Sequence, residues 1–120
     1  MNMELNLAVV SGPLSAAPEI RQLPSGSSVA NLAVRAPTVG GATSVPVSVW
    51  DPPAWLAELA TGDEVIVLGA VRRRFYRAGG GTGSRVDVEA TFVGRPGKRQ
   101  IGTVARRMEA TLAELTGGAG

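Results

Sequence analysis

The 120-residue sequence contains no cysteine and no histidine. Without cysteine it can form neither disulfides nor thiolate metal sites, and without histidine it lacks the commonest general base and the commonest metal ligand. Its ten carboxylates form no cluster of the kind that paired acid and base catalysis needs. We therefore expect a protein that is not an enzyme and that uses no cofactor, metal or small-molecule substrate.

The sequence also lacks a long hydrophobic run. Its apolar segments are far shorter than the ~20 residues that span a bilayer, and the first residues lack a basic region followed by a hydrophobic segment. We expect no membrane contact and a cytoplasmic location. A chain of this length can form one domain with a hydrophobic core of its own, and it needs no disulfides or bound metal to be stable.

Aromatic residues are few, but two of them lie in the most informative segment, Arg72–Arg77, which reads Arg-Arg-Arg-Phe-Tyr-Arg after a strand-like apolar run. Guanidinium groups neutralise phosphates, and a flat ring stacks on an unpaired base. Because side chains alternate along a strand, Arg72, Arg74 and Tyr76 should share one face and the residues between them the other. The segment indicates binding of single-stranded nucleic acid, with a charged, solvated hairpin tip as the alternative.

The net charge is only +2, but it is unevenly distributed. Residues 72–107 contain ten basic residues against two acidic ones, a net charge of +8, whereas residues 1–71 carry −4. Eleven of the twelve basic residues are arginine, which forms bidentate hydrogen bonds with phosphate and stacks on bases better than lysine does. This asymmetry favours an anionic partner, with compositional drift in an arginine-rich proteome as the alternative.

Alternating apolar residues and turn signals predict an all-β domain. The predicted strands are 5–14, 19–23, 29–36, 44–50, 64–77 and 84–94. A short helix should lie between Asp51, which can cap it, and Thr61-Gly62, which can end it, with Trp55 as a core anchor. With residues 5–36 as one long bent meander, we count five strands in the order strand, strand, strand, helix, strand, strand, which is the arrangement of a five-stranded OB-fold barrel with its helix between the third and fourth strands. Such barrels commonly bind single-stranded nucleic acid on one face.

Apolar residues recur at helical spacing near the end of the sequence and predict an amphipathic helix over residues 100–115. They are Ile101, Val104, Ala105, Met108, Leu112 and Leu115. We expect this helix to dock on its own barrel or on a neighbouring subunit. The sequence thus divides into an OB-fold domain, residues 1–95, and a basic linker with a C-terminal helix, residues 96–120, whose glycine-rich end at 117–120 should be frayed.

An ordered series of short motifs extends over residues 2–94. It consists of Asn2, Val10-Ser11-Gly12-Pro13-Leu14, Pro18-Glu19-Ile20-Arg21, Ser25-Gly26, Val29-Ala30-Asn31-Leu32, Val47-Ser48-Val49-Trp50, Leu56-Ala57, Gly62-Asp63-Glu64-Val65 and Gly69-Ala70-Val71-Arg72. In this series the chain resembles the bacterial single-stranded DNA-binding proteins. The resemblance implies an OB fold, sequence-independent binding of single-stranded DNA in replication, recombination or repair, no cofactor, a nucleoid-associated location and usually a homotetramer. The sequence separates neither DNA from RNA nor a tetramer from a dimer.

The resemblance also implies two base-stacking residues, Trp50 and Tyr76. Two other aromatic positions of the family are lost here, one in the loop around residues 37–43 and one at Ser44. Members of the family commonly end in an acidic tail with a hydrophobic tip, where this sequence has a basic segment. We therefore expect a short form that lacks the tail and the recruitment of partners through it.

The predicted DNA-binding set combines these stacking residues with arginines that can contact phosphate, a second aromatic and an amide. It consists of Trp50, Tyr76, Arg72, Arg74, Arg77, Arg35, Arg73, Phe75 and Asn31. Phe75 should point away from Tyr76 and serves either in stacking or in packing. Asn31 is either a polar contact or a structural hydrogen-bonding group. The alternative function is an OB-fold protein-interaction or assembly module, which the loss of two aromatic positions favours and the +8 segment opposes.

Overall fold

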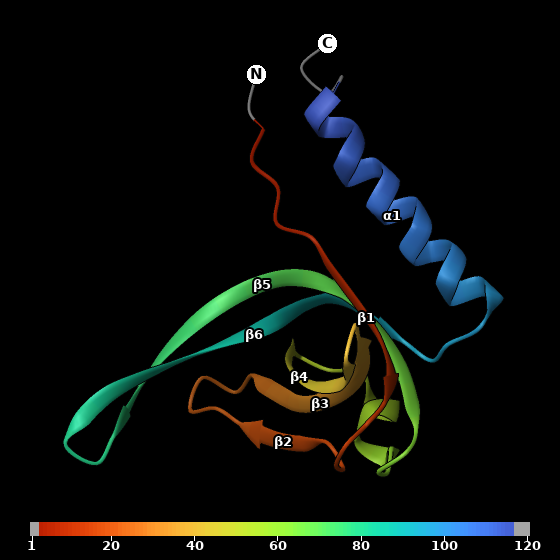
Figure 1. Ribbon diagram of the computed structural model, residues 1–120. Helices are drawn as coiled ribbons and strands as arrows, with labels where there is room; N and C mark the ends of the chain where they lie inside the picture. Colours follow the sequence, from red (N-terminus) through yellow and green to blue (C-terminus); the bar gives the residue numbers. More distant parts are fainter. Residues whose placement is uncertain (1–2, 117–120) are drawn as a thin grey trace.

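The structure, a computed structural model, describes residues 3–116 (Figure 1). It is built mainly of strands, with a short 3₁₀ helix between β4 and β5 and an α-helix after the last strand. The elements are β1 (Ala8–Pro13), β2 (Glu19–Gln22), β3 (Ser28–Thr38), β4 (Gly41–Trp50), η1 (Ala54–Glu58), β5 (Glu64–Ala78), β6 (Gly81–Gly94) and α1 (Lys98–Thr116). Each predicted strand is present, although β1 starts later and β3 and β4 extend further than predicted.

The strands form one sheet in the order β1-β5-β6-β4-β3-β2. Its two edge strands, β1 and β2, follow each other in the sequence, so the sheet must curl round to bring both edges together. Just after β1, Leu14 forms an isolated bridge with Val34, and the amide of Ser15 donates to the carbonyl of Ala33 at 2.8 Å. If β1 and β2 are counted as the two halves of one bent strand, the chain has five strands, with the short helix between the third and the fourth, as predicted. The all-β OB fold with a C-terminal helix is therefore confirmed, although the ladder of hydrogen bonds stays open between β1 and β2.

The bent first strand crosses β3 at very short range. A Cβ atom added to Gly12 would lie 1.9 Å from the carbonyl oxygen of Arg35. Only a residue without a side chain can occupy this crossing. Gly12 thus lets β1 pass over β3 on its way from one edge of the sheet to the other.

The core lies inside the curled sheet and follows the two-residue period that the sequence predicts. Its buried side chains are Leu14, Ala30, Leu32, Val34, Val47, Val49, Leu56, Leu59, Val65, Val67 and Val88. Trp50 lies at the end of β4 and is 41% exposed, while its neighbour in sequence, Val49, is buried. Trp55 is half-buried against the core, and the guanidinium carbon of Arg95 lies 5.2 Å from the centre of its ring.

The short internal helix differs from the prediction in type and in its start. It is a single 3₁₀ segment, and Asp51 does not cap it. Asp51 has a φ of 47°, and its amide and carboxylate instead form hydrogen bonds with the backbone of Ser28 at 2.8 and 3.3 Å. The two prolines that follow explain this, since a residue before proline is disfavoured in the helical region. Pro53 is itself extended, so the helix begins only at Ala54.

Helix α1 packs on the outer side of its own sheet (Figure 1). Val104, only 3% exposed, contacts a buried pair on β5, Ile66 and Leu68. Ile101 and Leu112 are 53% and 42% exposed, so only part of the predicted apolar stripe is covered. Between residues 3 and 116 no helix is long and apolar enough to cross a membrane. Asn2 of the motif series and the glycine-rich end at 117–120, which we expected to be frayed, lie outside the described residues.

Candidate nucleic-acid interface

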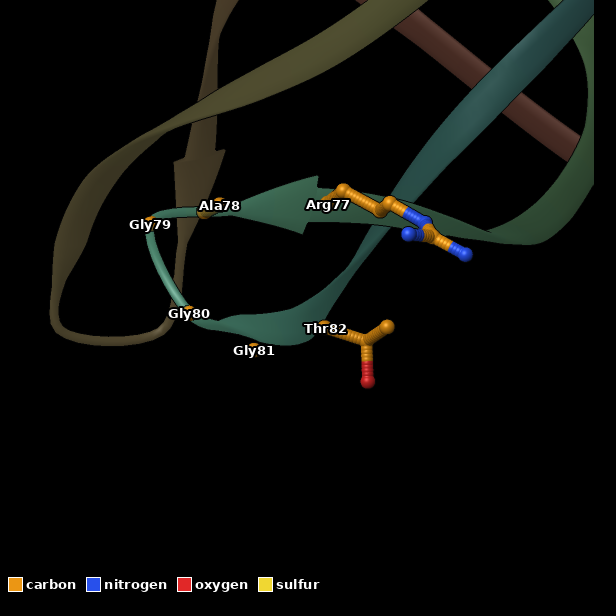
Figure 2. A pocket seen from close by; sticks show the side chains of 6 residues that line it. All are labelled: Arg77, Ala78, Gly79, Gly80, Gly81 and Thr82. Atoms are coloured by element: carbon orange, nitrogen blue, oxygen red, sulfur yellow. The ribbon is translucent and has the colours of Figure 1, made fainter.

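Strands β5 and β6 continue past the rest of the sheet as a two-stranded arm (Figure 1). The arm extends from the pair Arg72 and Asp87 to the pair Ala78 and Gly81 at its tip. Figure 2 shows the tip, residues 77–82, where Gly79 and Gly80 turn the chain at positive φ. The basic segment of the sequence thus forms one strand of this arm.

A groove of about 860 Å³ lies between the arm and the outer face of β2, β3 and β4. It is lined by Glu19, Arg21, Val29, Asn31, Trp50, Arg72, Arg73, Arg74, Phe75, Tyr76 and Arg85. Seven of the nine predicted binding residues are therefore brought together, although they come from three different strands. The other two lie elsewhere, because Arg77 is at the tip of the arm and Arg35 lies further along β3.

Two rows of residues form the floor of the groove. The pairing of the strands places Glu19 opposite Asn31, and it places Arg21 opposite Val29, which in turn lies opposite Trp50. Cross-strand partners share one face of a sheet. The floor therefore has one row that contains Val29 and Trp50 and a neighbouring polar row that contains Asn31. Arg21 and Glu19 lie at the outer ends of these two rows, on β2.

Two aromatic rings lie on the arm, and both are accessible. Tyr76 is 49% exposed and Phe75 is 76% exposed. The ring of Tyr76 covers its cross-strand partner Gly83, where an added Cβ atom would lie 2.6 Å from Tyr76 Cζ. The pairing puts Tyr76 and Phe75 on opposite faces of the arm, as predicted, yet both contribute to the groove. Two-stranded ribbons twist strongly, which lets both faces contribute to one groove.

Arg74 lies where the arm joins the barrel, and acidic and polar groups surround it. Its Nε donates to Asp87 Oδ2 at 2.7 Å, and its Nη2 donates to Ser48 Oγ at 2.9 Å. Its guanidinium carbon lies 5.8 Å from the centre of the Trp50 ring. Asp87 and Ser48 are both buried, and Oδ1 of Asp87 has no hydrogen-bond partner within residues 3–116. Arg74 thus connects the arm, the floor of the sheet and Trp50.

The arginines of the groove differ in whether their charge is already balanced. Arg72 forms an ion pair with Glu89, and Arg74 forms one with Asp87. Arg21, Arg73 and Arg85 form no ion pair with any residue that the structure describes, although Arg73 Nη1 donates to Ser84 Oγ at 3.1 Å. Among the groove arginines, these three have no acidic side chain in the described part of the chain that competes with an external anion.

Sequence reasoning did not find Glu19, Arg21, Val29 and Arg85 as part of the site. Arg85 could have been found from the predicted hairpin, since it pairs with Arg74. Glu19 and Arg21 depend on the register of β2 with β3, and Val29 depends on the register of β3 with β4, neither of which follows from local sequence pattern. Within the described residues, no group of three or more acidic side chains is placed to hold a metal ion.

Comparison with known proteins gives matches among solved structures only. No family model matches the sequence, and no curated protein matches it. A crystal structure of the wild-type single-stranded DNA binding protein from Thermus aquaticus matches with a TM-score of 0.64 and 26% sequence identity, over 78% of this chain and 41% of that one. A deletion mutant of the same protein matches with a TM-score of 0.65 and 27% identity, over 78% of this chain and 42% of that one. The chain thus spans less than half the length of each of these two solved chains.

Proposed function

Because the chain has an OB fold of the kind found in single-stranded DNA-binding proteins, confirming the resemblance seen in its sequence, we propose that it binds single-stranded DNA in the groove beside its arm. One observation carries the proposal. Exposed aromatic rings and arginines without acidic partners, from separate parts of the sequence, line a single groove. We propose a non-enzymatic role, because a groove that offers stacking surfaces and positive charge suits binding.

Binding combines short-range stacking of bases on aromatic rings with longer-range electrostatic attraction between arginines and phosphates. Bases stack on Trp50, Tyr76 and Phe75, each stack contributing on the order of 1–3 kcal/mol. Phosphates are neutralised by Arg73 and Arg85 on the arm and by Arg21 at the edge of the floor, with Arg35 and Arg77 beyond the groove. Both interactions are largely indifferent to base identity, so we expect little overall sequence preference and steep dependence on salt.

The proposal extends to the setting in which the protein acts. We propose a role in DNA replication, recombination or repair, a homo-oligomeric state as tetramer or dimer, and a cytoplasmic location on the nucleoid. These rest on the resemblance rather than on the groove. We also propose that residues 1–95 form the binding domain, because no α1 residue lines the groove.

The test is a titration with a dT oligomer of about 35 nucleotides, long enough for two sites even at the largest size, about 16 nucleotides, that one OB fold occupies. Trp55→Phe leaves Trp50 as the only tryptophan, so fluorescence reports on the groove. We expect quenching on binding, and weaker binding in Trp50→Ala and Tyr76→Ala. A dU and an rU oligomer of equal length compare DNA with RNA.

Absence of binding at low salt would contradict the proposal and leave the assembly module as the function. Binding that is unchanged in both aromatic variants would instead contradict the location of the site. Measuring the unfolding of each variant by urea separates loss of a stacking surface from loss of the fold.

A further inference from the structure

Glu19 is an unexpected residue in a groove for a polyanion. It lines the groove from the edge strand β2, it is exposed, and its carboxylate forms no ion pair within residues 3–116. Arg21 lies two residues away on the same face, yet the two do not pair. A phosphate placed beside this carboxylate would be repelled. Glu19 therefore marks a part of the groove where bases, rather than the sugar-phosphate backbone, should lie.

The position of Glu19 relative to Trp50 supports this orientation. Glu19 pairs with Asn31 on β3, and Asn31 lies one row from Val29, the cross-strand partner of Trp50. From the usual strand spacing and rise, the Cα atoms of Glu19 and Trp50 are about 12 Å apart. A base stacked on Trp50 and an extended glutamate side chain can together span this distance. The edge of such a base, directed along the floor, meets Asn31 first and Glu19 next.

The two side chains differ in the bases they can accept. The amide of Asn31 both donates and accepts, so it can pair with the edge of any base, whereas an ionised carboxylate only accepts. Cytosine N4 and adenine N6 are amino donors, while thymine presents the O4 acceptor at the equivalent position. Building on the proposed DNA-binding function, we infer that Glu19, assisted by Asn31, makes the position beside Trp50 prefer bases with an exocyclic amino group over thymine.

The experiment compares dC and dT oligomers of equal length with the full chain. The wild type is compared with Glu19→Gln, which keeps the shape of the side chain but can donate as well as accept. Glu58→Gln is the matched control, because Glu58 is an exposed carboxylate on η1 outside the groove. We expect the ratio of dC to dT affinity to fall about fivefold in Glu19→Gln, the effect of roughly one hydrogen bond of ordinary net strength, and to stay unchanged in Glu58→Gln.

The ratio of dC to dT affinity separates recognition of a base by Glu19 from repulsion of phosphate by its charge. If Glu19→Gln strengthens binding of both oligomers by the same factor, the carboxylate only repels phosphate and the inference is wrong. An equal change of the ratio in the control variant also overturns it. If the wild type binds neither oligomer, the proposed function itself fails, and the inference fails with it. Tight binding with an unchanged ratio overturns only the inference.

Discussion

Arg74 and Asp87 form an ion pair at the root of the arm, with 2.7 Å between Arg74 Nε and Asp87 Oδ2. The carboxylate is buried, and the guanidinium also reaches Ser48 on β4 and lies over Trp50. The sequence predicted Arg74 as a phosphate contact. That prediction stays untested, and from the partners of Arg74 we propose a structural role, which is to hold the arm and the Trp50 ring in a fixed relation.

Removing Arg74 should therefore reduce stability more than an exposed arginine would. Arg74→Leu leaves Asp87 buried without a counter-charge, and we expect a loss of about 3 kcal/mol in the free energy of unfolding. Adding Asp87→Asn removes that charge, so the double variant should be more stable than Arg74→Leu alone by about 1 kcal/mol or more. Urea denaturation measures both. Strictly additive losses would show that the two side chains are not coupled.

The salt dependence of DNA binding distinguishes the arginines that contact phosphate. Each phosphate contact on a single strand contributes about 0.7 to the slope of log affinity against log salt. We expect Arg73→Ala and Arg85→Ala each to reduce the slope by about this amount. The pair Arg74→Leu with Asp87→Asn is neutral in charge and should leave the slope unchanged, even where affinity falls.

The control for these measurements is Arg99→Ala, which removes an exposed arginine on α1 outside the groove. If Arg99→Ala lowers the slope as much as Arg73→Ala does, the effect comes from overall charge rather than from the groove. A fall of about 0.7 in the slope for the neutral double variant would instead show that Arg74 contacts a phosphate.

The sequence predicts those features of this fold that depend on local pattern. Alternation placed Val49 in the core and Trp50 outside it, and the glycine-rich turn joined β5 to β6. Features that depend on register could not be predicted, because Arg21 is placed in the same row as Trp50 only by the pairing of β2 with β3 and of β3 with β4. Charge pairing was also missed. Asp87 lies thirteen residues from Arg74 in the sequence, and only the hairpin register brings them together.

The crossing of β1 over β3 gives a prediction about the fold alone. Gly12→Ala would place a Cβ atom 1.9 Å from the carbonyl oxygen of Arg35, so the two strands must separate. We expect a loss of about 3 kcal/mol in the free energy of unfolding, since backbone cannot yield as a flexible side chain does. Gly40→Ala is the control, because its Cβ would meet open space, and its cost should be under about 0.5 kcal/mol. Equal costs in both variants would mean that the crossing is looser than described.

Gly83 offers a way to move Tyr76 without removing it. A Cβ atom in Gly83→Ala would lie 2.6 Å from Tyr76 Cζ, so the ring must leave its place over the arm. We expect about tenfold weaker binding of the dT oligomer, within the range for loss of one stacked base. Gly81→Ala, where the new atom meets open space, should bind normally. In a Tyr76→Ala background Gly83→Ala should have no further effect, because the ring it displaces is absent. A similar loss in that background would mean that Gly83 acts through the shape of the arm and not through Tyr76.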